Sequence, residues 1–180
     1  MHHDYNDPYI ERCFERMDNS KNVACFKEVM GNYPTGVTVV TTVDEQGVPL
    51  GLTVNSFASV SLDPLLVLWS IDKRVSTYET FIKTDKFAVH VLSADQGDIC
   101  SLFASRDIDR FGNCEWALSE QNLPIIAGAS GVMQCKTFKT IEAGDHTILI
   151  GEVVAIESEN KEPLLYHKRK FGKIPDEFYI

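Results

Sequence analysis

The chain has 180 residues, 44% of them hydrophobic, which is enough for one compact domain with a real core and short for two. Its 17 basic and 26 acidic residues give a net charge of -9, the wrong sign for a general partner of nucleic-acid phosphates or of an anionic membrane. Because no run approaches the length of a transmembrane helix and the N-terminus has no apolar signal-peptide stretch, we expect a cytoplasmic protein that uses no nucleic acid and no membrane.

The first predicted elements are a short helix and a hairpin. In residues 22–30, apolar side chains recur at helical spacing and a glycine follows, which predicts an amphipathic helix behind an N-terminal extension of residues 1–21. Between residues 36 and 55, β-branched residues dominate both sides of the turn DEQG, which predicts two antiparallel strands.

The rest of the chain alternates between strand and helix patterns. Residues 64–71 are an almost continuous apolar run and residues 85–93 alternate, so both are predicted as interior strands. Helical spacing appears in residues 76–84 and 94–105, and residues 130–157 predict a longer hairpin around the turn EAGD. Six or more strands and three short helices without a βαβ rhythm predict a mainly β fold, a closed or nearly closed, Greek-key-like barrel with peripheral helices.

The common enzyme and metal motifs are absent from this sequence. It has no GxxxxGKS/T, GxGxxG, HExxH or GxSxG pattern, so phosphate-loop, Rossmann, zincin and α/β-hydrolase functions lose their main support. The cysteines are odd in number and form no CxxC pair; they are Cys13, Cys25, Cys100, Cys114 and Cys135. We interpret them as reduced thiols and expect no metal site.

Three polar features remain to be explained. The strand end in residues 51–64 carries Asn55, Ser56 and Ser59, more hydrogen-bonding capacity than a core needs, although a bulge or strand end would also account for them. The cluster DKRVST at 72–77 fits either an anion site or a solvated loop with a helix cap. The histidine of GDH at 144–146 fits either a site or an ordinary turn.

Five motifs, in order, resemble the flavin reductase family, the split-barrel FMN-binding proteins that include the reductase components of two-component flavin monooxygenases. The motifs are YPTGVTVVTT (33–42), GLTVNSFASVSLDP (51–64), FAVHVLSADQ (87–96), GDHTILIGEV (144–153) and PLLYHKRKF (163–171). The resemblance implies a flavin reductase-like domain over residues 22–171 and a C-terminal tail over 172–180, which is expected to pack on the barrel or on a second subunit unless it is simply solvated.

The resemblance also implies where ligands bind. Backbone groups and hydroxyls at the strand end would meet the polar rim of the flavin ring, and this set is Pro34, Thr35, Gly36, Thr53, Val54, Asn55, Ser56, Phe57 and Ser59. The flavin phosphate would be held by Lys73, Arg74, Ser76, Thr77 and, as a further candidate, Arg110. Beside the nicotinamide the resemblance places His146, with Tyr166 and Arg169 of the tail.

The implied function is NAD(P)H-dependent reduction of FMN, or of FAD or riboflavin, by a homodimer that supplies reduced flavin to a partner oxygenase. Hydride transfer from nicotinamide to flavin needs no protein base, so the absence of a catalytic triad is no objection. The alternative is an FMN-carrying electron-transfer protein with a protein donor; a flavoenzyme acting on an organic or metal-containing substrate is a weaker one. His90 replaces the asparagine common in FAVNVL and is interpreted as a satisfied barrel histidine, and Trp69 as a core residue.

Overall fold

In the computed structural model of the protein, residues 19–106 and 108–178 are described. Contacts divide the chain into one unit that ends at Tyr33 and another that begins at Pro34, and each is described by itself. The first unit contains helix α2, Asn19–Gly31, which confirms the predicted helix with three more residues at its start. Most of the predicted extension, with Cys13, lies outside the described residues, and the domain boundaries after residues 21 and 171 stay predictions.

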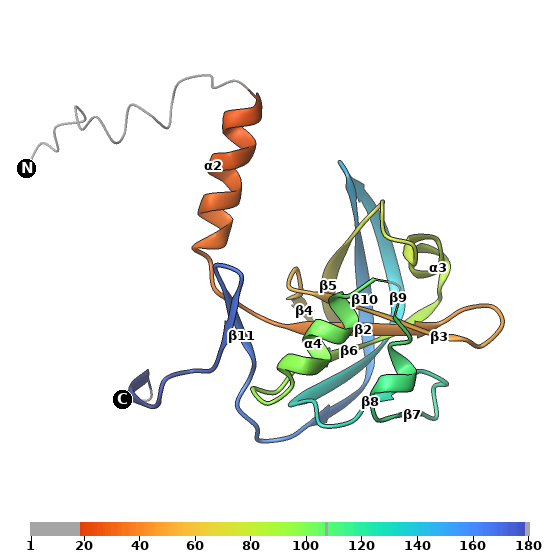
Figure 1. Cartoon of the computed structure of the whole chain (residues 1–180). Helices are drawn as coiled ribbons and strands as arrows, with labels where there is room; N and C mark the ends of the chain where they lie inside the picture. The colour runs from red at the N-terminus through yellow and green to blue at the C-terminus, as the bar shows by residue number, and fades with distance from the viewer. Residues whose placement is uncertain (1–18, 107, 179–180) are drawn as a thin grey trace, which may run out of the picture. The chain divides into compact units, whose positions relative to one another are not determined.

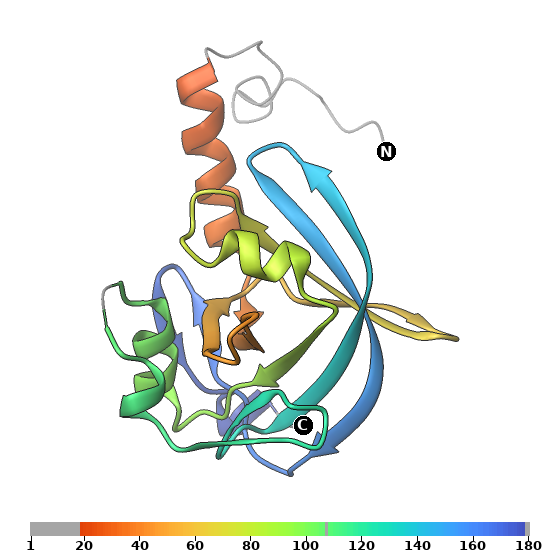
Figure 2. The same ribbon diagram turned by 90° about the vertical axis from the view of Figure 1, so that its right-hand side faces the viewer.

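The frame of the second unit is an antiparallel sheet of seven strands (Figure 1). They are β2 Thr38–Val43, β3 Pro49–Val54, β4 Ala58–Leu62, β5 Leu65–Asp72, β6 Lys86–Val91, β9 Gly131–Ala143 and β10 His146–Ser158. Their order is β3-β2-β6-β9-β10-β5-β4, so the long β9–β10 hairpin, which arches across the unit in Figure 2, separates β5 from β6. Both predicted hairpins and both interior strands are confirmed.

Short elements complete the second unit. The helices are α3 Tyr78–Lys83 and α4 Gly97–Ala104, with single 3-10 turns at Phe111–Asn113 and Asp176–Phe178. The small strands are β1 Thr35–Gly36, β7 Trp116–Leu118, β8 Pro124–Ile126, β11 Leu165–His167 and β12 Lys170–Gly172. β7 pairs with β8, and β11 joins β1 to β12. Helices α3 and α4 confirm the two helices predicted for this unit.

The mainly β fold is confirmed, but the ladder of the barrel does not close. β3 and β4 remain the two edges of the seven-stranded sheet. β4 is only five residues long and carries a register shift between Ser59 and Ser61. In the segment between β3 and β4, the hydroxyl of Ser56 donates to the carbonyl of Ser70 of β5 (3.2 Å) and accepts from its N–H (2.9 Å). With both edges unpaired the barrel is split, and Ser56 holds the β3–β4 connection to β5.

Two apolar clusters fill the second unit, and Trp69 lies in the larger one. Its side chain is fully buried, with its ring centroid 5.2 Å from that of Phe81 of α3 and 5.8 Å from that of Phe87 of β6, both edge to face. A methyl group on Gly151 would lie 2.5 Å from Phe87, so β10 needs a glycine to pass this cluster. The interpretation of Trp69 as a core residue is confirmed.

His90 is a satisfied, fully buried histidine, as the sequence indicated. The N–H of Ile126 donates to its Nε2 atom (3.1 Å), so Nδ1 carries the proton and donates to the carbonyl of Val39 (3.1 Å). Burial lowers the pKa of His90 to about 4, because charging the ring would cost its solvation. The ring is therefore neutral in the folded protein at physiological pH.

We expect His90 to make stability depend on pH. In the unfolded chain its pKa returns to about 6.5, so below that pH the unfolded state binds a proton that the folded state does not. The contribution is complete above pH 6.5 and falls by roughly 3 kcal/mol as the pH drops toward 4. In His90→Asn, which keeps a donor for Val39, this part of the decline should vanish. Urea unfolding between pH 7 and pH 4.5 measures the difference, and parallel profiles for the two proteins would contradict it.

Candidate functional site

Two clefts flank the end of β3, where the sequence predicts the flavin. One, of about 250 Å³, is lined by Val37, Thr53, Val54, Asn55, Cys100, Ala104, Tyr166 and Phe171. The other, of about 220 Å³, is lined by Leu52, Thr53, Val54, Asn55, Ser56, Ser70, Ile71, Asp72, Val75 and His146. Residues 53–55 belong to both, so the strand end is the wall that the two clefts share. Each cleft alone is smaller than the roughly 300–1,000 Å³ typical of small-molecule sites.

Two of the hydroxyls predicted to contact the flavin already make hydrogen bonds within the protein. Thr53 donates to the carbonyl of Cys100 (2.8 Å), which fixes α4 against β3, and Ser56 bridges to Ser70. The exposed side chain of Asn55 makes no hydrogen bond to another described residue. Ser59 lies on the exposed edge strand beside the register shift, as the bulge alternative implied. Among these side chains, Asn55 therefore has its hydrogen-bond donors and acceptor available for a ligand.

Removing the Ser56 bridge should loosen this wall. Ser56→Ala leaves both backbone groups of Ser70 without their partner, and we expect the free energy of unfolding to fall by about 1–2 kcal/mol. Amide exchange at Ser70 should become faster as well. Ser56→Thr keeps the hydroxyl and is the matched control. Urea unfolding and hydrogen exchange measure both effects, and an alanine variant as stable and protected as the threonine variant would refute the bridge.

His146 stands in the second cleft at the first position of β10, opposite Asp72 of β5. Its Nδ1 atom lies 2.8 Å from Oδ1 of Asp145, and this hydrogen bond lowers the pKa of the Asp145 carboxyl. The half-exposed ring keeps Nε2 without a partner among the described residues. Asp145 can therefore hold the ring while Nε2 serves a ligand.

The predicted phosphate residues lie beside this cleft, and both cations already have carboxylate partners. Lys73 pairs with Glu142 (2.6 Å) and Arg74 with Asp72 (2.6 Å), and the Arg74 hydrogen bonds hold the pKa of Asp72 far below its usual range. Ser76 and Thr77 precede α3, and Thr77 makes no side-chain cap bond. A phosphate here would compete with two carboxylates, and the assignment stays a prediction.

The remaining predicted residues lie in different places. Arg110 lines neither cleft: it donates to the carbonyls of Gly51 (3.1 Å) and Ser105 (2.5 Å), joining the segment after α4 to β3. Tyr166 lines the first cleft and is paired with Thr35, whose buried hydroxyl has no partner among the described residues. The other four have these positions: Pro34 and Gly36 flank Thr35, Phe57 packs against the larger core cluster, and Arg169 lies in the turn between β11 and β12.

The sequence did not identify Cys100, Ala104 or Phe171 as site residues. Cys100 and Ala104 enter the first cleft because α4 docks on Thr53, a tertiary contact without a local signal. Burial raises the pKa of the Cys100 thiol, so the group stays protonated and forms an apolar wall. Apolar walls with a few polar groups at a strand end fit a planar ring that has apolar faces and a polar rim.

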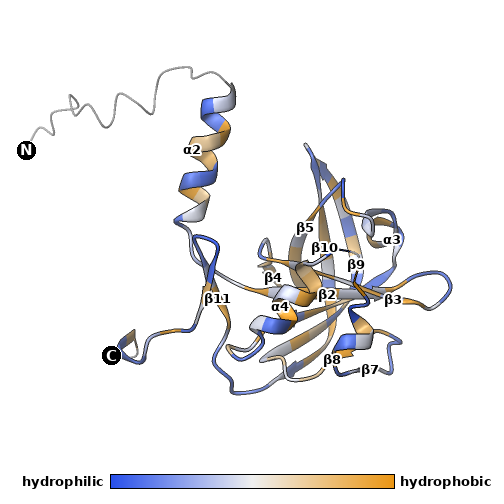
Figure 3. Cartoon of the chain, viewed as in Figure 1, coloured by the Kyte–Doolittle hydropathy of each residue, from blue (hydrophilic) through white to orange (hydrophobic). Residues whose placement is uncertain are grey.

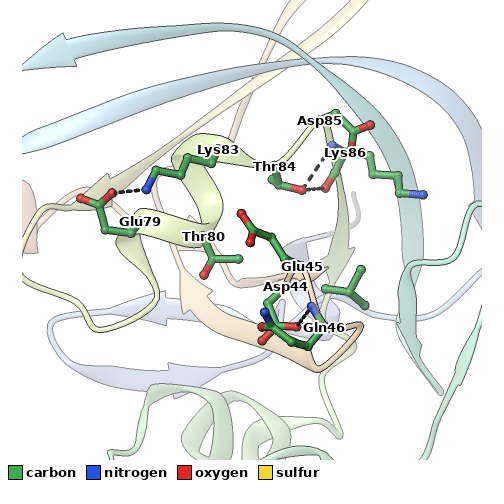
Figure 4. A pocket seen from close by; sticks show the side chains of 10 residues that line it. Asp44, Glu45, Gln46, Glu79, Thr80, Lys83, Thr84, Asp85 and Lys86 are labelled. Atoms are coloured by element: carbon green, nitrogen blue, oxygen red, sulfur yellow. Dashed lines mark hydrogen bonds and ion pairs between the residues drawn. The ribbon is translucent and has the colours of Figure 1, made fainter.

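A polar pocket of about 420 Å³ lies elsewhere in the second unit, next to the β2–β3 turn (Figure 4). Glu79 pairs with Lys83 (3.0 Å), and Oδ1 of Asp44 accepts the N–H groups of Gln46 and Val48. Carboxylates outnumber ammonium groups there, and no predicted site residue lines it. In the described part of the chain, no three His, Cys, Asp or Glu residues gather to hold a metal ion, and no helix is long and apolar enough to cross a membrane.

The structure is a split β-barrel domain with two clefts at the end of β3, and known proteins with this fold are similar to the chain. Residues 30–175 match the family model described as "Flavin reductase like domain". The reductase component of the flavin-dependent trigonelline monooxygenase of Acinetobacter baylyi is 43% identical over 152 residues, 84% of this chain and 49% of that protein. The FMN reductase (NADH) SmoA of Agrobacterium fabrum is 42% identical over 153 residues, 85% and 87% of the two chains.

Solved structures agree with this likeness. The NADH:FAD oxidoreductase SgcE6 of Streptomyces globisporus, solved in complex with NAD and FAD fragments, superposes with a TM-score of 0.82 at 36% identity, covering 89% of this chain and 98% of that one. The chain thus spans about half of the trigonelline protein but most of SmoA and SgcE6. It belongs to the flavin reductase family.

Proposed function

We propose that the protein is an NAD(P)H-dependent flavin reductase. The observation that carries this function is the polar strand end at residues 53–55, which lines both clefts, since the flavin and the nicotinamide must bind in contact with each other at one place for a hydride to pass between them. SmoA and SgcE6 are named as reductases that use NADH, which supports NADH as the reductant. Flavin-dependent NADH oxidation by the purified protein tests the proposal.

The chain would act by binding and positioning its two ligands. When both are bound, the reduced nicotinamide supplies a hydride to the flavin without a protein base. The backbone and the Asn55 side chain at the end of β3 would meet the polar rim of the flavin, and the apolar residues of α4 would cover its face. Lys73 and Arg74 would take the flavin phosphate, and His146 would orient the nicotinamide.

The flavin is proposed to be FMN, with FAD and riboflavin as further acceptors. SmoA is named an FMN reductase, whereas SgcE6 is named an NADH:FAD oxidoreductase, so related chains use both flavins. Because both clefts are open at the surface, the flavin can leave as a product. Comparing initial rates with FMN, FAD and riboflavin decides the preference.

We further propose a cytoplasmic homodimer that hands reduced flavin to a monooxygenase. The trigonelline protein is named as the reductase component of such an enzyme, which supports the partner. Edge strand β4 exposes Val60 and Leu62, the latter 87% exposed, as a second subunit would require. The four described cysteines are free thiols, as expected for a reducing compartment. Light scattering after size exclusion tests the dimer, and a monomer at working concentration would remove it.

His146→Ala should impair the use of NADH but not the binding of FMN. Loss of one ligand hydrogen bond predicts an increase in KM, or a decrease in kcat, of about tenfold. His146→Gln retains a polar group near the position of Nε2 and should recover part of the loss. Steady-state kinetics and an FMN titration provide both readouts. A variant that folds normally but no longer binds FMN would show that His146 belongs to the flavin site.

A further inference from the structure

The β11–β12 hairpin carries an unusual concentration of positive charge. In a chain with a net charge of -9, Lys168, Arg169, Lys170 and Lys173 lie within six residues, and residues 167–173 include no acidic one. All four side chains are exposed, and none pairs with a carboxylate among the described residues. The hydrophilic colouring of this hairpin tip is visible in Figure 3. Exposed, unpaired cations can accept an anion without first losing a partner.

The two central residues of this turn have positive φ values although neither is glycine or asparagine. Lys168 and Arg169 have φ values of +48° and +63°, in the left-handed region that disfavours residues with a β carbon. A two-residue hairpin turn of this kind normally uses Asn-Gly. Strained non-glycine residues tend to occur at functional sites. Two long cationic side chains in these positions therefore suggest a role that outweighs the stability of the turn.

The turn lies at the edge of the first cleft. Tyr166 and Phe171, a cross-strand pair whose ring centroids are 5.5 Å apart, both line that cleft. One residue separates each of them from the turn, and two residues of strand span about 7 Å. Tyr166 also pairs with Thr35 and packs on the smaller core cluster, so the base of the hairpin is fixed. Lys168 and Arg169 can thus reach a group that projects from the cleft mouth.

We propose that the β11–β12 turn binds the phosphate groups of a nucleotide bound at the adjoining cleft, an inference that rests on the proposed reductase function and that, for the flavin, competes with the assignment of its phosphate to Lys73 and Arg74. The guanidinium of Arg169 can bind two phosphate oxygens at once, and Lys168 adds a second charge. The ligand chemistry is a phosphate or pyrophosphate, carried by the flavin or by the dinucleotide. Unlike Lys73 and Arg74, these cations have no carboxylate to displace.

The double variant Lys168→Asn/Arg169→Gly distinguishes a role of the turn in ligand binding from a role in stability. Asn-Gly is the favoured pair for this turn, so the midpoint of thermal unfolding should stay the same or rise. Affinity for the phosphate-bearing ligand should fall about tenfold at low ionic strength, and the difference should shrink as salt increases. If the turn only supported the fold, this variant, with equal or greater stability, would bind the ligand as tightly as the wild type does.

Calorimetric titrations of the whole protein with FMN, riboflavin and NADH, each alone, identify the source of the phosphate. Weaker FMN with unchanged riboflavin assigns the turn to the flavin phosphate, and weaker NADH with unchanged flavins assigns it to the dinucleotide. Lys136→Gln/Lys139→Gln, two exposed cations of β9 that line neither cleft, is the charge-matched control.

The inference is overturned if all three dissociation constants stay within about twofold of the wild type, or if the β9 control loses the same affinity. A wild type that binds neither FMN nor NADH would overturn both proposals. A wild type that binds them but oxidises no NADH would overturn only the reductase function. If Lys73→Ala/Arg74→Ala weakens FMN and the turn variant does not, the turn does not bind the flavin phosphate, and the inference then stands only if the turn variant weakens NADH.

Discussion

Replacing Ala104 with tryptophan should abolish flavin binding while the protein keeps its fold. Ala104 is the exposed last residue of α4 and lines the first cleft, so an indole there would fill space that the ligand needs. A blocked cleft predicts a loss of affinity of roughly hundredfold or more. The position is exposed, so thermal unfolding should move by no more than a few degrees. Flavin fluorescence titration and a thermal melt give the two readouts.

Ala117→Trp is the matched control for this experiment. Ala117 lies on β7, is exposed and lines neither cleft, so the same increase in size there should leave flavin affinity unchanged. If Ala104→Trp binds FMN as tightly as the wild type does, the flavin does not occupy the cleft beside α4, and the assignment of the site fails.

Trp69→Ala should cause the largest loss of stability of any change considered. The residue is fully buried between Phe81 and Phe87, and its removal leaves a cavity that two strands and a helix cannot collapse to fill. Losses of about 3–5 kcal/mol are typical for such a change, a large part of the roughly 5–15 kcal/mol available to a domain. Because β5 also carries Ser70 and Asp72, flavin binding should weaken together with stability.

Trp69→Phe is the control for this experiment, because it keeps an aromatic ring in the core and loses less volume than alanine does. The indole N–H has no partner among the described residues, so phenylalanine removes an unsatisfied donor and should cost much less than alanine. Urea unfolding should be followed by far-UV circular dichroism, because Trp116 is the other of the two tryptophans and fluorescence would report a different region. A loss below about 1 kcal/mol in Trp69→Ala would contradict its central place in the core.

The larger elements were predictable because their signals are local. Both predicted hairpins have β-branched runs on either side of a glycine turn, and Gly47 and Gly144 have φ values of +80° and +65°. The strands β1, β7, β8, β11 and β12 are two or three residues long and were not predicted. β7 with β8 and β11 with β12 are local hairpins of three-residue strands, too short for a clear alternating pattern, whereas β1 forms only through its pairing with the distant β11.

The outline of the candidate site came from the resemblance and not from local patterns, and the roles of its residues stay predictions. The resemblance brought Thr53–Ser56 and His146 together, and the structure places them around one cleft. Ser56 illustrates what the sequence could not show: its hydroxyl was predicted to meet a ligand, but a strand far away in the sequence supplies its backbone partners. The expected split barrel is present, with β3 and β4 as its unpaired edges, and the register shift in β4 has no local signal in the sequence.

Aerobic oxidation of NADH and NADPH by the purified protein, with FMN, with FAD, with riboflavin and without added flavin, tests whether the protein is a flavin reductase. We expect nucleotide consumption that depends on added flavin and saturates with it, with NADH preferred. If the protein holds a yellow flavin but consumes neither nucleotide, the reductase function is contradicted, and a flavin carrier with a protein electron donor takes its place.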